Sequence, residues 1–183
     1  MIKIVFILLS FCVVPFAQSQ VAIKTSPVLF AVGALNAEVG VALGSNLSIA
    51  AGGLTWSGTL DSVETDDSVD FSVTEVHARI DYWFSGAYKQ GWYIGGTVSN
   101  MSINLKTTQS GIEYEGDISA TGILGQFGYH WQWDSFFIDL GARAGTYNFD
   151  SKLEVESDGG ATQEEEIPAI SSGGLEFNIG WVF

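Results

Sequence analysis

Apolar and polar residues alternate along most of the chain, in short stretches separated by polar or glycine-containing segments. Residues 174–183 show this best, because every second residue is apolar and the others are polar or glycine. The apolar set is Leu175, Phe177, Ile179, Trp181 and Phe183. Successive side chains of a strand point to opposite faces, so this stretch predicts a strand with one apolar face. A soluble strand lying on a core would show the same alternation, so the pattern alone leaves the environment open.

The same alternation predicts eight strands. They are expected near residues 21–32, 35–43, 47–56, 73–84, 92–103, 118–132, 136–149 and 174–183. Pro27 should bulge the first strand or delay its start, because proline lacks the amide hydrogen that a closed sheet uses. The intervening segments are short at 44–46, 86–91 and 133–135 on one side, and long at 57–72, 104–117 and 150–172 on the other. This asymmetry is typical of outer-membrane barrels.

Residues 73–84 show why a soluble core fits poorly. One face of this strand is apolar and partly aromatic, from Val76 to Phe84, and the other carries Glu75, His77, Arg79 and Asp81. The second face is too charged to bury dry, and the first is too aromatic to leave in water. In a transmembrane barrel the apolar face would meet lipid and the charged face would line the lumen.

Composition agrees with this interpretation. The 183 residues are 46% hydrophobic and 15% charged, with 22 glycines, 12 phenylalanines and six tryptophans. After Phe16 no apolar run approaches the roughly 18 residues of a membrane-spanning helix. A closed barrel is the other backbone arrangement that satisfies its hydrogen bonds in lipid. We therefore predict an all-β fold: an eight-stranded antiparallel transmembrane β-barrel with short periplasmic turns and long acidic outer loops.

The first residues have the three parts of a secretory signal peptide. Lys3 is followed by an apolar run over residues 4–14 and by small residues at Ala17 and Ser19. The predicted organisation is a signal peptide at 1–19 and a barrel domain at 20–183. Cys12 is the single cysteine, so removal of this segment excludes disulfides and thiolate metal sites.

Aromatic residues sort by depth along the predicted strands, which favours two interfacial belts. The periplasmic set is Tyr82, Trp83, Phe84, Trp92, Tyr93, Trp131, Trp133, Phe136, Trp181 and Phe183. The outer set is Trp56, Phe71, Tyr114, Tyr147 and Phe149.

With these strands and this ending, the sequence resembles the small eight-stranded outer-membrane barrels, the group that includes the OmpA transmembrane domain, OmpX and OmpW. The resemblance implies a location in the outer membrane of the Gram-negative cell envelope, contact with outer-membrane lipid and lipopolysaccharide, and a monomer. It also implies that Phe177, Ile179, Trp181 and Phe183 form the signal that the barrel-assembly machinery recognises.

Charged residues at inward positions predict a network inside the barrel. They are Glu38, Glu75, His77, Arg79, Asp81, Asp139, Arg143 and Glu176. Because buried charges must pair or be hydrated, the favoured interpretation is a plug of salt bridges around the two arginines. The alternative is a narrow, porin-like channel, in which an excess of carboxylates would favour cations.

Enzymatic chemistry is not expected, although some barrels of this size modify lipid A with a histidine and a serine. His77 lies mid-strand and His130 lies near the periplasmic end, and no Gly-x-Ser-x-Gly motif occurs. No cofactor is predicted. Residues 66–70 lack the glycine and the terminal glutamate of a calcium-binding loop, so no metal site is predicted either.

Fifteen of the 21 acidic residues fall in the three long segments, including Glu164, Glu165 and Glu166. They could be simply solvated, or they could share divalent cations with lipopolysaccharide phosphates. Loss of the signal peptide would leave a net charge of about −15, which disfavours nucleic acid. The sequence thus predicts a structural or surface-interaction role. A soluble barrel of lipocalin type, with its apolar residues inward, is a further alternative.

Overall fold

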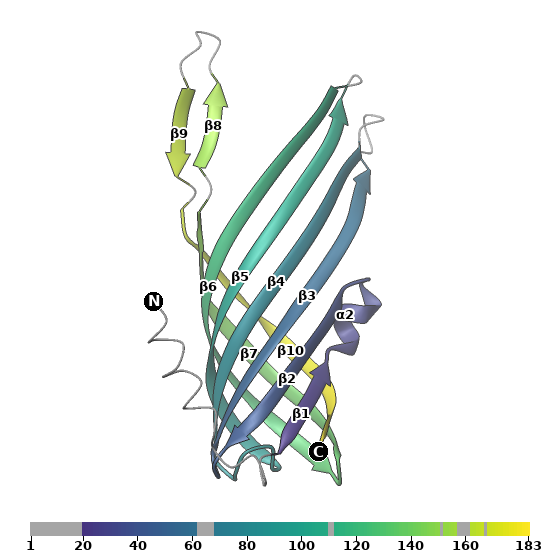
Figure 1. Cartoon of the computed structure of the whole chain (residues 1–183), viewed down its shortest axis with the longest axis vertical. Helices are drawn as coiled ribbons and strands as arrows, with labels where there is room; N and C mark the ends of the chain where they lie inside the picture. Colours follow the sequence, from purple (N-terminus) through teal and green to yellow (C-terminus); the bar gives the residue numbers. More distant parts are fainter. Residues whose placement is uncertain (1–19, 62–67, 110–111, 151, 157–161, 167) are drawn as a thin grey trace, which may run out of the picture.

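The computed structural model describes residues 20–61, 68–109, 112–150, 152–156, 162–166 and 168–183. Eight antiparallel strands close into a barrel in the order β1-β10-β7-β6-β5-β4-β3-β2 (Figure 1). The barrel strands are β1 (Val21–Thr25), β2 (Leu35–Leu43), β3 (Leu47–Asp61), β4 (Ser68–Trp83), β5 (Gly91–Gln109), β6 (Ile112–Trp133), β7 (Phe136–Phe149) and β10 (Ile170–Val182). The predicted fold class is confirmed. The predicted signal peptide, residues 1–19, lies outside the described residues.

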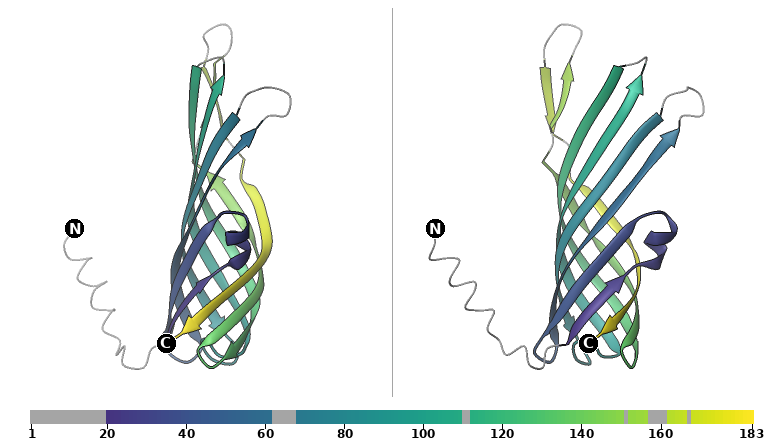
Figure 2. Two further views of the ribbon diagram at one scale, coloured as in Figure 1. Left: turned by 90° about the vertical axis from the view of Figure 1, so that its right-hand side faces the viewer. Right: turned by 45° about the vertical axis from the view of Figure 1, so that its right-hand side comes forward.

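The two ends of the barrel differ. At one end, called the turn end here, short turns at 44–46, 84–90 and 134–135 join the strands, and β1 begins beside the end of β10. Gly44 and Asp134 take positive φ angles of 76° and 51° in two of these turns, as tight reversals require. At the opposite end, called the hairpin end, β3 to β6 rise well beyond the neighbouring β2 and β10 (Figure 2).

The strands at the hairpin end are longer than the alternation predicted. Segments 57–72 and 104–117 were expected to be loops, yet β3 pairs with β4 out to Asp61 and Ser68, and β5 pairs with β6 out to Gln109 and Ile112. The Thr59 hydroxyl donates a 2.6 Å hydrogen bond to Asp70 within the first extension. Leu60, Val69, Phe71 and Leu105 have the inward parity of these strands, so the apolar outer face ends there while the backbone pairing continues. Glu64, Asp66 and Asp67 lie outside the described residues.

The segment 150–172 also departs from the predicted loop. It contains a separate two-stranded hairpin, β8 (Lys152–Glu156) and β9 (Thr162–Glu166), and β10 begins at Ile170 rather than near Gly174. In Figure 1 this hairpin continues beyond the ends of β7 and β10.

The first strand is much shorter than predicted, because β1 ends at Thr25 and a short helix follows, α2 (Pro27–Ala31). Pro27 stands in the first turn of α2, where its missing N–H loses no helical hydrogen bond and its fixed φ suits the helix. In the part of the chain that the structure describes, none of the helical segments has the length and hydrophobicity of a membrane-spanning helix.

Apolar side chains of the barrel face outward, as predicted. Ile80, Leu140 and Phe177 are 53%, 47% and 36% exposed on the outer face, while inward neighbours such as Arg79 and Asp139 are buried. A lipocalin-type interior would place the apolar set inside, so that alternative is wrong.

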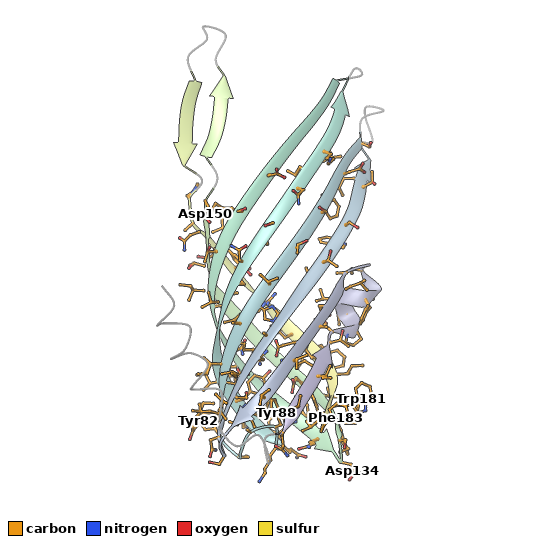
Figure 3. The ribbon with its side chains drawn as sticks, viewed as in Figure 1. Tyr82, Tyr88, Asp134, Asp150, Trp181 and Phe183 are labelled. Atoms are coloured by element: carbon orange, nitrogen blue, oxygen red, sulfur yellow. The ribbon has the colours of Figure 1, made fainter. Side chains whose placement is uncertain are left out.

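A belt of aromatic side chains surrounds the outside of the turn end. Tyr82, Trp181 and Phe183 lie there in Figure 3, and Trp92 stacks on Phe127 with 4.8 Å between ring centroids. Six residues assigned to the belts have the inward parity of their strands instead, two of them, Trp56 and Phe71, toward the hairpin end. The other four pack inside the barrel and are Trp83, Tyr93, Tyr147 and Phe149. The Tyr114 side chain lies outside the described part of the chain.

Candidate functional site

A network of charged side chains crosses the middle of the lumen, centred on Glu38 of β2. One carboxylate oxygen of Glu38 lies 3.0 Å from Lys24 Nζ, and the other lies 3.1 Å from His77 Nε2 and 3.7 Å from Arg79 Nη1. Lys24 and Glu38 are direct cross-strand partners on β1 and β2, so the sheet register itself brings them together.

Arg79 extends the network in two directions. Its Nε donates a 2.8 Å hydrogen bond to Asp81, two residues along the same inward face of β4. Its Nη1 lies 3.8 Å from Glu176 on β10, and Glu176 in turn lies 3.5 Å from Arg143. Gln126 then donates a hydrogen bond to Asp81 and accepts one from Thr97, so the carboxylate is held from β6 and β5 as well.

Two further carboxylates complete the set. Glu75 lies 3.8 Å from His77 Nδ1, and Asp139 lies 2.6 Å from the buried ring of His130. Lys24 also reaches Asp139, at 3.8 Å. All eight residues predicted for the lumen therefore belong to one connected network.

Lys24 was missing from the predicted set, although it is central in the structure. Its signal was present in the alternation of Val21 and Ile23, which face outward, with Ala22 and Lys24, which face inward. Because Pro27 made the length of this strand uncertain, the sequence pattern did not identify Lys24 as a lumen residue.

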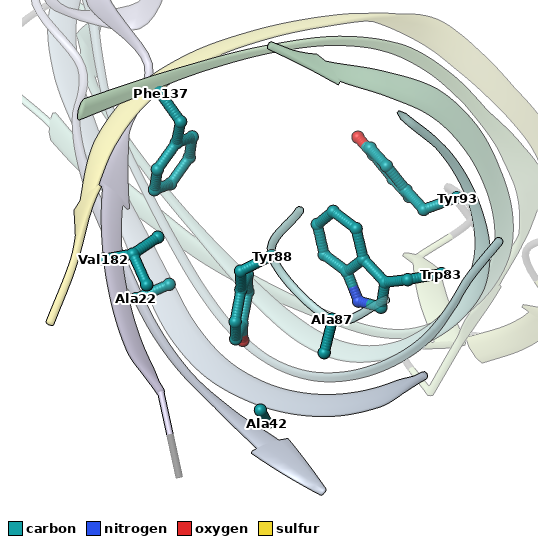
Figure 4. Packing of buried hydrophobic residues seen from close by; sticks show 8 residues of the cluster. All are labelled: Ala22, Ala42, Trp83, Ala87, Tyr88, Tyr93, Phe137 and Val182. Atoms are coloured by element: carbon teal, nitrogen blue, oxygen red, sulfur yellow. The ribbon is translucent and has the colours of Figure 1, made fainter. Parts of the chain in front are cut away.

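Between the network and the turn end, an aromatic plug fills the barrel. Its large members are Trp83, Tyr88, Tyr93 and Phe137, packed among small residues including Ala42 and Val182 (Figure 4). The Trp83 ring lies 5.1 Å from that of Tyr88 and 4.9 Å from that of Tyr93, and its Nε1 donates a 2.9 Å hydrogen bond to Ser48. The sequence analysis missed this plug, although the inward parity of Trp83 was available.

Tyr88 enters the plug from the turn rather than from a strand. The 84–90 turn folds back into the barrel, with Tyr88 at a positive φ of 55° and only 6% exposed. Burial raises the pKa of its hydroxyl to about 12. Gly40 makes room for it, since a Cβ there would collide with the Tyr88 hydroxyl. An αL tyrosine is disfavoured by itself, so packing must hold this conformation.

Little space remains around these groups at the turn end. A cavity of only about 10 Å³ lies between the network and the plug, bordered by Glu38, Asp81, Trp83 and Tyr88. That is about the room one water molecule needs. A second cavity, of about 370 Å³, lies on the other side of the network, toward the hairpin end. The larger of these two cavities thus lies on the hairpin side of the network.

Within the described ranges, no group of three or more histidine, cysteine, aspartate or glutamate side chains is placed to hold a metal ion. The carboxylates of the lumen face basic or amide groups instead, as in the Arg79–Asp81 and Lys24–Glu38 pairs.

Comparisons with known proteins agree with the fold. A family profile described as "Protein of unknown function (DUF3575)" matches residues 3–166. No curated protein matches the chain. A major outer membrane protein from Thermus thermophilus is similar in structure, with a TM-score of 0.50 and 11% identity over 91% of this chain and 100% of that one.

Neisserial surface protein A (NspA) is also similar, with a TM-score of 0.46 and 12% identity over 90% of this chain and 96% of that one. At such identities the likeness concerns the fold alone. The predicted resemblance to small eight-stranded outer-membrane barrels is confirmed by the closed antiparallel topology and by the similarity to the Thermus protein.

Proposed function

The chain belongs to the DUF3575 family of proteins of unknown function, and we propose that it is a non-conducting outer-membrane barrel. Its role is structural or surface-interactive, and it is not an enzyme. The observation that carries this proposal is the closed lumen, in which network and plug leave a cavity of about 10 Å³ at the turn end.

The outward apolar surface supports the membrane location. Exposed apolar side chains run around the barrel, among them Ile23, Val39, Ile80, Ile123 and Leu140. Soluble monomers rarely expose contiguous apolar surface of this kind. A closed barrel satisfies its strand hydrogen bonds internally, so it can hold such a surface in lipid.

The asymmetry of the barrel supports an orientation. Short turns of outer-membrane barrels face the periplasm and long connections face outward, so the turn end is periplasmic and the extended hairpins are external. The hairpins then carry most of the acidic residues, including Asp61, Asp70 and Asp117, away from the membrane. Surface interaction would take place there.

The closed lumen favours the non-conducting role over the porin-like alternative. Arg79 and Asp81 are 5% and 4% exposed, and the Arg79 guanidinium also lies 5.3 Å from the centre of the Tyr93 ring. A hydrated ion would have to break buried ion pairs and then displace the aromatic plug. Separating buried charges costs several kcal/mol for each pair, so conduction would be slow.

Single-channel recording in planar bilayers tests this proposal. We expect the wild-type chain to give no conductance steps. A triple variant, Arg79→Ser, Trp83→Ala and Tyr88→Ala, should give steps because it removes the network centre and two rings of the plug. Reproducible wild-type steps that disappear when the sign of the Arg79 charge is reversed would establish the channel instead.

A further inference from the structure

The barrel wall has a gap in its pairing on one side of β10. β1 pairs with β10 only through the four residues 22–25, which face Ile179 to Val182. The rest of β10, from Ile170 to Asn178, pairs with β7 on its other edge, and no described strand pairs with it on the β1 side. Figure 2 shows α2 beside this part of β10, where β1 would otherwise continue.

The 370 Å³ cavity passes through this gap. Its lining includes Glu176 and Asn178, which face the lumen, and also Leu175 and Phe177, which face outward from the same strand. A cavity that touches both faces of one strand must pass around its edge. Leu140 on the outer face of β7 and Val28 and Leu29 of α2 line it as well. One part of the cavity is therefore charged and the other is apolar.

Two carboxylate oxygens at the charged part accept no hydrogen bond, because the nitrogen atoms that face them, His77 Nδ1 and Arg79 Nη1, lie 3.8 Å away. These oxygens are Glu75 Oε1 and Glu176 Oε2, both buried, and Glu75 is only 6% exposed. Leaving a buried acceptor unsatisfied is costly, more so when it is charged. Apart from His77, the lining has as many lysine and arginine residues as glutamates, and Asp81 and Asp139 of the same network add negative charge nearby. The site therefore fits a ligand that donates hydrogen bonds and carries a positive charge.

We propose that this cavity binds the protonated primary amine of an alkyl-chain amphiphile, which enters through the wall between α2 and β10. The amine donates to Glu75 and Glu176, and the alkyl chain lies along Leu140, Leu175 and Phe177. A volume of about 370 Å³ is within the usual range of small-molecule sites. The same amine chemistry occurs in free alkylamines and in ethanolamine phospholipids. This inference goes beyond the proposed function, which concerns conduction.

Calorimetric titration of the purified full chain in non-ionic detergent tests the chemistry of the head group. Dodecylamine is the probe, and dodecyltrimethylammonium is its match in charge and chain length but has no N–H donors. We expect dodecylamine to bind at least about tenfold more tightly, since charge-assisted hydrogen bonds are lost in the second compound. Equal affinities, or tighter binding of dodecyl sulfate, would overturn the proposal.

Substitutions inside and outside the cavity test where dodecylamine binds. Glu75→Gln and Glu176→Gln should each weaken dodecylamine binding by about tenfold, while Asp117→Asn, at an exposed position outside the cavity, should leave it unchanged. Leu175→Ala should weaken binding, whereas Ile123→Ala, an equally outward apolar position on β6, should not. Equal effects in the cavity and control variants would contradict the assignment. If a glutamate variant fails to fold, the head-group comparison on the wild type still decides.

Native mass spectrometry distinguishes the two sources of the amine. Retention of an ethanolamine phospholipid over the matching choline phospholipid would identify a membrane lipid as ligand. Dodecylamine binding without this lipid preference would identify a free amine, and binding of neither would overturn the proposal. A conducting barrel that still selects amines would refute the proposed function alone, so the two failures are separable.

Discussion

Lys24 on β1 reaches across β10 to Asp139 on β7, with 3.8 Å between Nζ and Oδ2. The contact runs diagonally across β10, because Gly180, which has no side chain, is the register partner of Lys24, and Asn178 is the register partner of Asp139. The closing strand is thus spanned from inside by an ion pair between its two neighbours. Lys24 also holds Glu38 at 3.0 Å, so a single cation serves carboxylates from β2 and β7.

Replacement of this cation tests its role in closing the barrel. Lys24→Met should lower the free energy of unfolding by about 3–5 kcal/mol, because Glu38 and Asp139 would keep buried charge without their partner. Urea titration in detergent micelles, followed by tryptophan fluorescence, measures the change. Lys89→Met is the matched control, since Lys89 is exposed in the 84–90 turn. Equal stability of the two variants would contradict a structural role for Lys24.

The sequence predicted the barrel because the membrane-facing part of each strand alternates strictly. β2 and β7 begin and end at the predicted residues, 35–43 and 136–149. Prediction failed where the apolar outer face ends: at the hairpin end of β3 to β6 the outward positions are mostly polar, so a search for apolar outer faces does not separate paired strand from loop there. The eight lumen residues followed from parity alone, but their partners depend on register between strands, which one strand's pattern does not reveal.

Inward aromatic residues were harder to interpret than inward charges. Trp83 and Tyr93 directly follow the outward residues Tyr82 and Trp92. All four lie at the same depth, so the sequence predicted that all four belong to the periplasmic belt. The 84–90 turn was predicted as a simple connection, and nothing local indicated that Tyr88 folds back into the lumen. That placement depends on Gly40, a residue 48 positions away, and becomes visible only in three dimensions.

Gly40 should be intolerant of even one added methyl group. Gly40→Ala places a Cβ against the Tyr88 hydroxyl, so the ring must shift within a packed plug, and we expect a loss of about 1–3 kcal/mol in unfolding free energy. Gly174→Ala is the control, because a Cβ there has open space around it. Tyr88→Phe should recover part of the loss when combined with Gly40→Ala, which a double-mutant cycle measures. Strictly additive effects would argue against the contact.

Tyr88 should make stability fall in alkaline solution. Burial raises its pKa from 10.0 to about 12, so the folded state keeps the proton over a range in which the unfolded state loses it. The contribution is fully present below pH 10 and is lost between pH 10 and 12. Two pKa units correspond to about 3 kcal/mol.

Urea midpoints at pH 8, 10 and 12 measure this loss. The other tyrosines also ionise in this range, so the informative quantity is the difference between the wild type and Tyr88→Phe. That difference should change by up to about 3 kcal/mol between pH 10 and 12. A constant difference across the range would show that the buried hydroxyl is not the titrating group.

Phe183 joins the last strand to the first. Its N–H donates a 2.8 Å hydrogen bond to the Val21 carbonyl, and the Val21 N–H donates a 3.1 Å hydrogen bond back. Its side chain is 73% exposed on the outer face, in the belt of aromatic side chains at the turn end. Removal of Phe183 would delete this pair of hydrogen bonds between β10 and β1. It would also delete the last residue of the predicted assembly signal. We therefore expect slower insertion and a smaller folded fraction.

Heat-modifiable migration in gels, followed over time after expression, separates these two effects. Loss of the hydrogen bonds alone would lower stability but leave the rate of insertion unchanged, whereas loss of the signal would slow insertion in cells and not in protein-free detergent. Phe183→Ala keeps the backbone pair and removes only the ring, so it isolates the signal. Normal insertion of Phe183→Ala together with normal insertion after removal of Phe183 would refute the assembly role, because neither the ring nor the final pair would then be required.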